Sequence, residues 1–142
     1  MRPLKRKLMN GESNPLPTAT SPRSLLRELF DQAVAAVSAE ACLSRALQLP
    51  PISGRTVLLA VGKAAAAMAS VAAKQIGGPV EGLVITRRGH AGPPHVLPTS
   101  VELIEAGHPI PDDESILGGE RALELVRGLG ARDRLLALIS GG

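Results

Sequence analysis

The chain has 142 residues, of which 44% are hydrophobic, and a formal net charge of +3. This length allows one modest globular core. The positive balance does not indicate nucleic-acid binding, because four of the positive charges lie in the first seven residues and Phe30 is the only aromatic residue that could stack on a base.

Residues 1–20 are expected to form a disordered leader. They are basic and rich in proline, but no apolar run follows the charges, so the segment lacks the hydrophobic region of a secretory signal.

Cys42 is the only cysteine, which excludes an internal disulfide and a Cys-based zinc site. No apolar stretch reaches the roughly 20 residues that a membrane span needs. We therefore expect a cytoplasmic protein without a membrane partner.

Two helices are expected at the start of the folded part. Ser21 and Pro22 form a strong helix start, because a serine hydroxyl can cap free backbone N–H groups and proline is tolerated in the first turn. From Leu25 to Val37, apolar side chains then recur on one helical face. A second, short helix is expected at 39–47, and two adjacent prolines end it.

Apolar strands and helices alternate through the rest of the chain. Short continuous apolar runs are typical of strands that are buried on both faces of a parallel sheet. The expected strands are 56–61, 81–86, 101–105 and 134–140, with helices at 64–75 and 113–129. This pattern predicts an α/β fold, a Rossmann-like, doubly wound and mostly parallel sheet with flanking helices.

The loop after the first strand contains Gly62 and Lys63. In open α/β sheets, ligands bind beyond the carboxyl ends of the strands, so the loops that follow the strands are the places to search. Glycine permits a tight turn there, and an ammonium group at the start of a helix favours a phosphate or a carboxylate. The loop lacks the upstream glycine and the following Ser or Thr of a P-loop, which excludes a Walker A motif. Taken alone, the pair is better explained as a turn followed by a solvated lysine.

The next two loops carry basic residues and a possible helix cap. The segment TRRGH at 86–90 includes Arg88 and could orient an anion or a proton donor, and the structural alternative is a solvated basic turn. His108 follows the third strand, and Asp112 can cap the helix that comes next. Of these residues, His108 is the hardest to explain by a structural role.

The chain ends in Ser140, Gly141 and Gly142 directly after the fourth strand. Glycines remove the steric obstacle of a side chain, so backbone N–H groups in this loop could approach a phosphate or a carboxylate closely. A parallel strand that leads straight into terminal glycines also suggests that the chain is truncated before its sheet is complete.

Four segments then occur together in an order that is typical of a known family. They are GRTVLLAVGKAAAAMA, GLVITRRGH, IEAGHPIPDDES and LLALISGG. From about Leu25 onward, the chain resembles the glycerate 2-kinase family, whose members are often labelled hydroxypyruvate reductase. Relatives are roughly three times as long, a size that normally means at least two domains. Residues 21–142 would then be an incomplete N-terminal α/β domain, with the second domain absent.

The resemblance implies an activity and a set of site residues. The activity is an ATP- and magnesium-dependent transfer of a phosphoryl group to the 2-hydroxyl of D-glycerate, which gives 2-phosphoglycerate. Lys63 would be the catalytic residue, and Arg88 departs from the family pattern because many relatives have an aromatic residue at that place. The residues expected to bind substrate or phosphate are Gly62, Arg88, His108, Ser140, Gly141 and Gly142. Metal ligands and oligomeric state stay unassigned.

Three alternatives remain beside the kinase. A nicotinamide-dependent hydroxypyruvate reductase would need G-x-G-x-x-G after the first strand and an acidic residue near the end of the second, and neither is present. The second alternative is a non-catalytic α/β fragment, in which an exposed last strand would leave an aggregation-prone edge. A weaker third is a sugar-phosphate or carboxylate binding module, which would bind glycerate without turning over ATP. For the kinase itself, we expect the 142-residue chain to be inactive alone.

Overall fold

The computed structural model describes residues 21–141 of the chain. The expected leader and Gly142 lie outside this range. The helices and strands of the described residues are α1 (Pro22–Ala36), α2 (Ala39–Ala46), β1 (Thr56–Val61), α3 (Ala65–Ile76), β2 (Glu81–Arg87), β3 (Val101–Ala106), α4 (Asp113–Arg127) and β4 (Arg134–Ile139). Every expected helix and strand is therefore present, with its ends shifted by two residues at most.

The helix α1 begins as its sequence predicts. The Ser21 hydroxyl accepts a hydrogen bond from the backbone N–H of Ser24 at 3.2 Å, which is the expected cap. No residue of this amphipathic helix is buried. None of the helices in residues 21–141 is long and apolar enough to cross a membrane.

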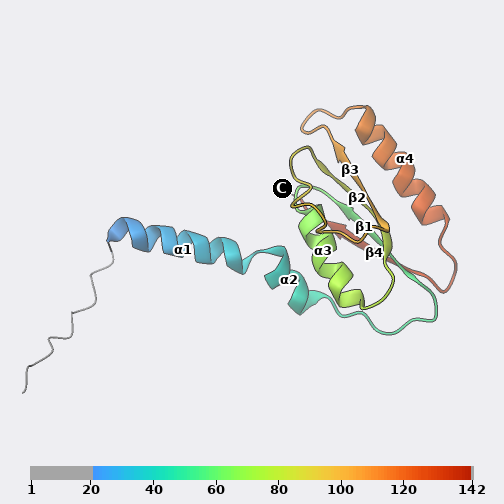
Figure 1. Ribbon diagram of the computed structural model, residues 1–142, viewed down its shortest axis with the longest axis horizontal. Coiled ribbons are helices and arrows are strands. Elements are labelled where there is room, and N and C mark those ends of the chain that lie inside the picture. Colours follow the sequence, from blue (N-terminus) through green and yellow to red (C-terminus); the bar gives the residue numbers. More distant parts are fainter. Residues whose placement is uncertain (1–20, 142) are drawn as a thin grey trace, which may run out of the picture. The chain divides into compact units, whose positions relative to one another are not determined.

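The four strands form one parallel sheet in the order β3-β2-β1-β4. From β1 the chain moves outward to β2 and β3, and it then returns through α4 to place β4 on the other side of β1 (Figure 1). The strand order therefore reverses between β1 and β4. In a doubly wound sheet, the crevice beyond the carboxyl ends at this reversal point is the usual place for a ligand.

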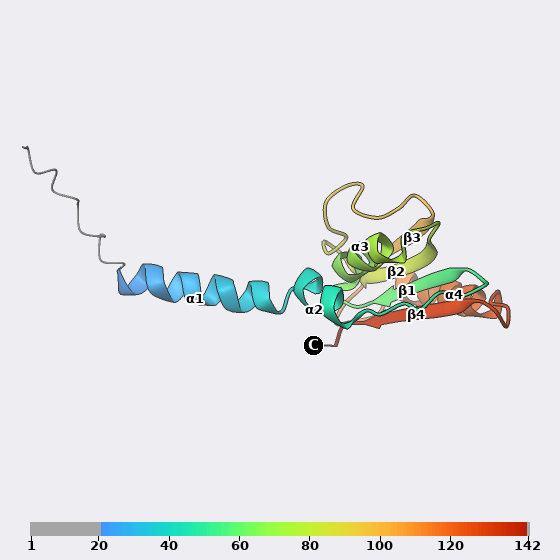
Figure 2. The same cartoon turned by 90° about the horizontal axis from the view of Figure 1, so that it is seen from below.

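Helices cover both faces of the sheet, with α3 on one face and α4 on the other (Figure 2). The face under α3 holds the core, in which Leu58 and Val84 are fully buried. Short alanine side chains let the helix lie close to the strands. Those in the core are Ala65, Ala66, Ala69 and Ala72. Gly77, with a left-handed φ of 68°, ends α3 as its sequence predicts.

The opposite face is covered less evenly. The helix α4 packs on β2 and β3, where Gly118 is buried against Ile85. The side chains of β4 that alternate away from α3 are exposed, and Ile139 is 75% exposed. Within the described residues, β4 is thus an edge strand with one apolar face that no helix covers.

Candidate active site

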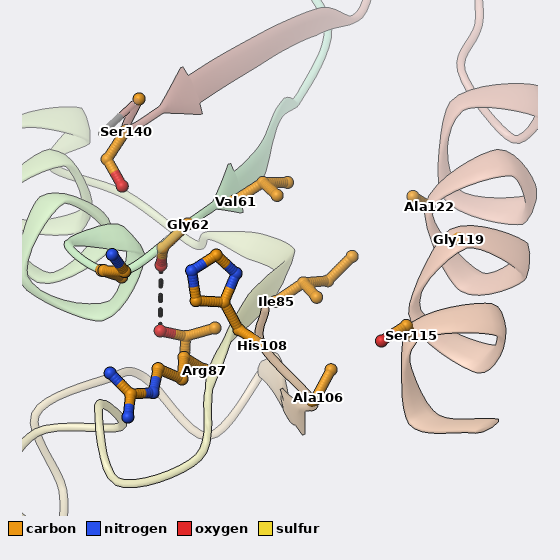
Figure 3. Close-up of a pocket in the computed structure, with 14 residues that line it drawn as sticks. Val61, Gly62, Ile85, Arg87, Ala106, His108, Ser115, Gly119, Ala122 and Ser140 are labelled. Carbon is orange, nitrogen blue, oxygen red and sulfur yellow. Dashed lines mark hydrogen bonds between the residues drawn. The ribbon is translucent and has the colours of Figure 1, made fainter. Parts of the chain in front are cut away.

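A cavity of about 510 Å³ lies at the carboxyl ends of all four strands. Its walls come from the strand ends, from the loops that follow them and from one face of α4, which contributes Ser115, Gly119 and Ala122. Figure 3 shows the α4 residues on one side and the turn at Gly62 on the other, with His108 on the side of the turn. The cavity therefore has a wall of small side chains and a wall of polar groups.

Gly62 makes the sharp turn that joins β1 to α3. Its φ of 112° lies in a region that side chains disfavour, and a Cβ atom there would come within 2.3 Å of the Ser140 Oγ atom. The turn is also held by hydrogen bonds: the Gly62 N–H donates to the Ile85 carbonyl at 3.0 Å, and the Thr86 hydroxyl donates to the Gly62 carbonyl at 2.9 Å (Figure 3). The next residue, Lys63, is thereby placed on the cavity wall.

Ser140 links the end of β4 to this turn. Its backbone N–H donates to the Val61 carbonyl at 2.9 Å, and its hydroxyl oxygen accepts the Ala64 N–H at 3.1 Å. The hydroxyl hydrogen is not used by either bond, so it can still be donated to a ligand. Ser140 therefore has two roles: it stabilises the start of α3, and it lines the cavity.

The polar wall carries positive charge, and no described residue of the lining supplies a matching negative charge. Lys63 and Arg87 line the cavity, and neither forms a salt bridge with any residue in the described range. No aspartate or glutamate is among the described residues of its lining. An ammonium and a guanidinium group near the start of a helix favour an anionic ligand, such as a phosphate or a carboxylate.

Most of the residues expected from the sequence meet in this cavity. The structure brings together Gly62, Lys63, His108, Ser140 and Gly141. Arg88 does not line it, because its guanidinium forms a salt bridge with Asp112 instead. That hydrogen bond raises the pKa of Arg88.

Two polar residues of the lining at the end of β2 were not singled out as site residues from the sequence. Thr86 is only 3% exposed and supports the turn at Gly62, and Arg87 was considered only as part of the basic loop. The available signal for Thr86 was a hydroxyl residue near the end of an apolar strand. No sequence signal separates Arg87 from Arg88.

Asp112 organises the loop between β3 and α4. As its sequence position predicts, it caps α4, and its Oδ1 atom accepts from the N–H groups of Gly107 at 2.9 Å and Ser115 at 3.1 Å. Together with the Arg88 guanidinium, these donors hold the pKa of Asp112 well below its usual range, with the Gly107 N–H as the largest cause. The carboxylate is therefore stabilised in its charged form.

This low pKa predicts a specific loss of stability in acid. A carboxyl group with a depressed pKa in the folded state stabilises the protein above its unfolded pKa, which is about 3.9, and loses that contribution as the pH falls. We expect Asp112→Asn to lower the thermal unfolding midpoint above about pH 5 and to differ progressively less from the wild type toward pH 2. Circular dichroism melts across this range measure the difference.

The matched control is Glu120→Gln, which changes an exposed carboxylate of α4 that makes no salt bridge with the described residues. Its melting curves should follow the wild type at every pH. A gap between Asp112→Asn and the wild type that stays constant down to pH 2 would show that the capping geometry matters and the charge does not.

The described residues do not fit a magnesium site. In residues 21–141, no group of three or more His, Cys, Asp or Glu side chains is placed to hold a metal ion. Magnesium prefers carboxylate, carbonyl and water oxygens, and the described part of the cavity offers no carboxylate. We therefore assign no metal ligand.

Comparison with known proteins finds one matching family and several relatives. Residues 25–142 match the family described as "Domain of unknown function (DUF4147)". The chain is 42% identical over 123 residues to a putative hydroxypyruvate reductase of Agrobacterium vitis, and this match covers 86% of the chain and 27% of the relative. It is 44% identical over 89 residues to a D-glycerate 2-kinase of Thermotoga maritima, over 62% of the chain and 21% of the relative.

A solved structure is also similar. The crystal structure of a glycerate kinase from Thermotoga maritima superposes with a TM-score of 0.70 at 36% identity, and the match covers 84% of this chain and 29% of that one. The chain thus spans about a quarter of the length of the curated relatives it matches.

Proposed function

Because this chain belongs to the DUF4147 family, and so to the glycerate 2-kinase family that its motifs resemble, we propose that it forms one wall of the active site of an ATP-dependent D-glycerate 2-kinase. The proposal depends on the cavity at the strand-reversal point, where Lys63 and Arg87 form no salt bridge with a described residue and the described lining holds no carboxylate. That charge pattern suits a ligand with phosphate and carboxylate groups.

The proposed reaction transfers the γ-phosphoryl group of ATP to the 2-hydroxyl of D-glycerate. A bond forms between the hydroxyl oxygen and the γ-phosphorus atom, the bond from that phosphorus to the β,γ-bridging oxygen breaks so that ADP leaves, and the hydroxyl proton is released to water. Such a transfer depends mainly on positioning and on neutralisation of the phosphoryl charge. The protein therefore needs preorganised positive groups beside the reacting oxygens.

The residues of the cavity divide these tasks. Lys63 neutralises charge on the transferring phosphoryl group, and the turn at Gly62 places it there. The N–H group of Gly141 and the hydroxyl of Ser140 hold phosphate or substrate oxygens. His108 binds substrate from the loop after β3. Magnesium would enter with ATP, and no step is assigned to it because the described residues offer no site for it.

A reductase is the rival activity, since one relative carries that name. A nicotinamide dinucleotide needs a glycine-rich first turn that its pyrophosphate can approach. Here the Ala64 N–H at that turn is already bonded to Ser140, and β2 ends in Thr86 and Arg87 where an acidic residue would bind the ribose. The site therefore favours phosphoryl transfer.

The test uses the longest protein that contains this chain. ATP consumption is measured with D-glycerate, and NADH consumption is measured with hydroxypyruvate. Glycerate-dependent ATP turnover without NADH oxidation would support the proposal. NADH oxidation without ATP turnover would overturn it in favour of the reductase, and a failure of both would leave a non-catalytic protein.

A cytoplasmic location, supported by the single cysteine, stays part of the proposal.

A further inference from the structure

Two adjacent arginines follow the buried part of β2, and the fold gives them different surroundings. Neighbouring residues of an extended chain point in opposite directions. Arg87 lines the cavity, whereas Arg88 does not and pairs with Asp112 (Figure 3 shows Arg87 on the same side of the cavity as His108). Only one of the two arginines therefore lines the cavity, while the side chain of the other is engaged by a carboxylate.

The backbone around Arg87 is held in place. Arg87 is paired with Ala106 of β3, and the Arg88 N–H donates to the Ala106 carbonyl at 3.2 Å. Two residues further on, the Gly89 N–H donates to the Glu105 carboxylate at 2.7 Å. With the Arg88–Asp112 salt bridge, these bonds fasten the loop to β3 and α4, so Arg87 starts from a fixed position at the cavity wall.

The Arg87 side chain is exposed, and it makes no hydrogen bond or salt bridge to any residue between 21 and 141. Its flat, forked guanidinium group matches the two oxygens of a carboxylate, while the compact ammonium of Lys63 acts as a point charge that suits a phosphoryl group. The two cations of the wall thus differ in the anion each recognises best.

We propose that Arg87, rather than Arg88, binds the carboxylate of the hydroxy-acid substrate in this cavity. This inference rests on the proposed function, and it adds the group that recognises the acid. It follows that Arg88 serves the site indirectly, by holding the loop through Asp112.

The experiment compares D-glycerate with D-glyceramide, in which a neutral amide replaces the carboxylate. Both are assayed as phosphoryl acceptors for the wild type, Arg87→Met and Arg88→Met in the longest protein that contains the chain. We expect Arg87→Met to raise KM for D-glycerate about 10- to 100-fold, because a charged bidentate contact is lost, and to change KM for D-glyceramide by much less. KM for ATP should stay nearly constant.

Two further variants sharpen the result. Arg87→Lys keeps the charge but loses the fork, so it should recover part of the affinity for D-glycerate. Arg88→Met should leave the ratio of the two KM values as in the wild type. An equal loss on D-glycerate and D-glyceramide, or a change of the ratio by Arg88→Met alone, would contradict the inference.

Binding of D-glycerate without ATP, measured by calorimetry, separates this inference from the kinase proposal. If ATP turnover is absent but Arg87→Met still weakens D-glycerate binding, the kinase proposal fails and the carboxylate site stands. If turnover is present and Arg87→Met has no effect on D-glycerate, the carboxylate site fails and the kinase stands. Loss of both turnover and binding in the wild type would refute both.

Discussion

Replacement of Lys63 by alanine is expected to reduce glycerate-dependent ATP turnover by about 100- to 1,000-fold, the loss usual for a group that stabilises transition-state charge. Lys63 is exposed at the cavity wall and makes no salt bridge with a described residue, so its charge is free to act on a ligand. The loss should fall mainly on kcat, because the interaction strengthens as the phosphoryl group transfers.

The matched control is Lys74→Ala, which removes the same kind of side chain from the last turn of α3, outside the cavity. Both variants should melt at the temperature of the wild type, since exposed substitutions usually change stability by less than about 0.5 kcal/mol. Equal turnover in Lys63→Ala and Lys74→Ala would remove Lys63 from the catalytic role.

Replacement of Gly62 by alanine is expected to lower both stability and turnover. The added Cβ atom would lie 2.3 Å from the Ser140 Oγ atom and 2.4 Å from the Ser140 carbonyl oxygen, at a φ of +112°. The Ser140 backbone cannot retreat easily, because its N–H is bonded to the Val61 carbonyl. Strain of this kind costs about 1–3 kcal/mol, and the shift of the turn would also move Lys63.

Urea unfolding measures the cost, with Gly78→Ala as the control. A Cβ atom at Gly78 meets nothing within 4 Å, and Gly78 does not have a positive φ. The urea unfolding midpoint of Gly78→Ala should therefore stay close to that of the wild type. A Gly62→Ala protein as stable as Gly78→Ala would mean that the turn relaxes without strain, and the close contact with Ser140 would then not explain why glycine is present.

The two variants together separate position from charge. Lys63→Ala removes the charge and leaves the turn intact, whereas Gly62→Ala keeps the charge and disturbs the turn. If both lose turnover and only Gly62→Ala loses stability, the placement of Lys63 by the turn is as necessary as the ammonium group itself.

The helices, the strands and the parallel sheet could be predicted because their signals are local. Apolar runs such as Thr56–Val61 indicate buried strands, and Gly77 and Asp112 mark helix ends through backbone freedom and hydrogen bonding. The loops that hold Gly62, Lys63 and His108 could be chosen for the same reason, since a parallel sheet collects the carboxyl ends of its strands at one edge.

The partners of these residues could not be predicted, because they come from distant parts of the chain. Ser140 contacts Gly62 only because β4 returns to the side of β1 away from β2, and a sequence does not state strand order. For the same reason, Asp112 was expected as a cap but not as the partner of Arg88.

The sequence by itself thus determined the secondary structure, the parallel α/β class and the edge of the sheet that holds the site. Only the tertiary structure decided which of two chemically equal arginines lines the cavity. Arg87 and Arg88 differ by a single position along an extended chain, and that position turns one side chain to the cavity and the other to a carboxylate 24 residues away.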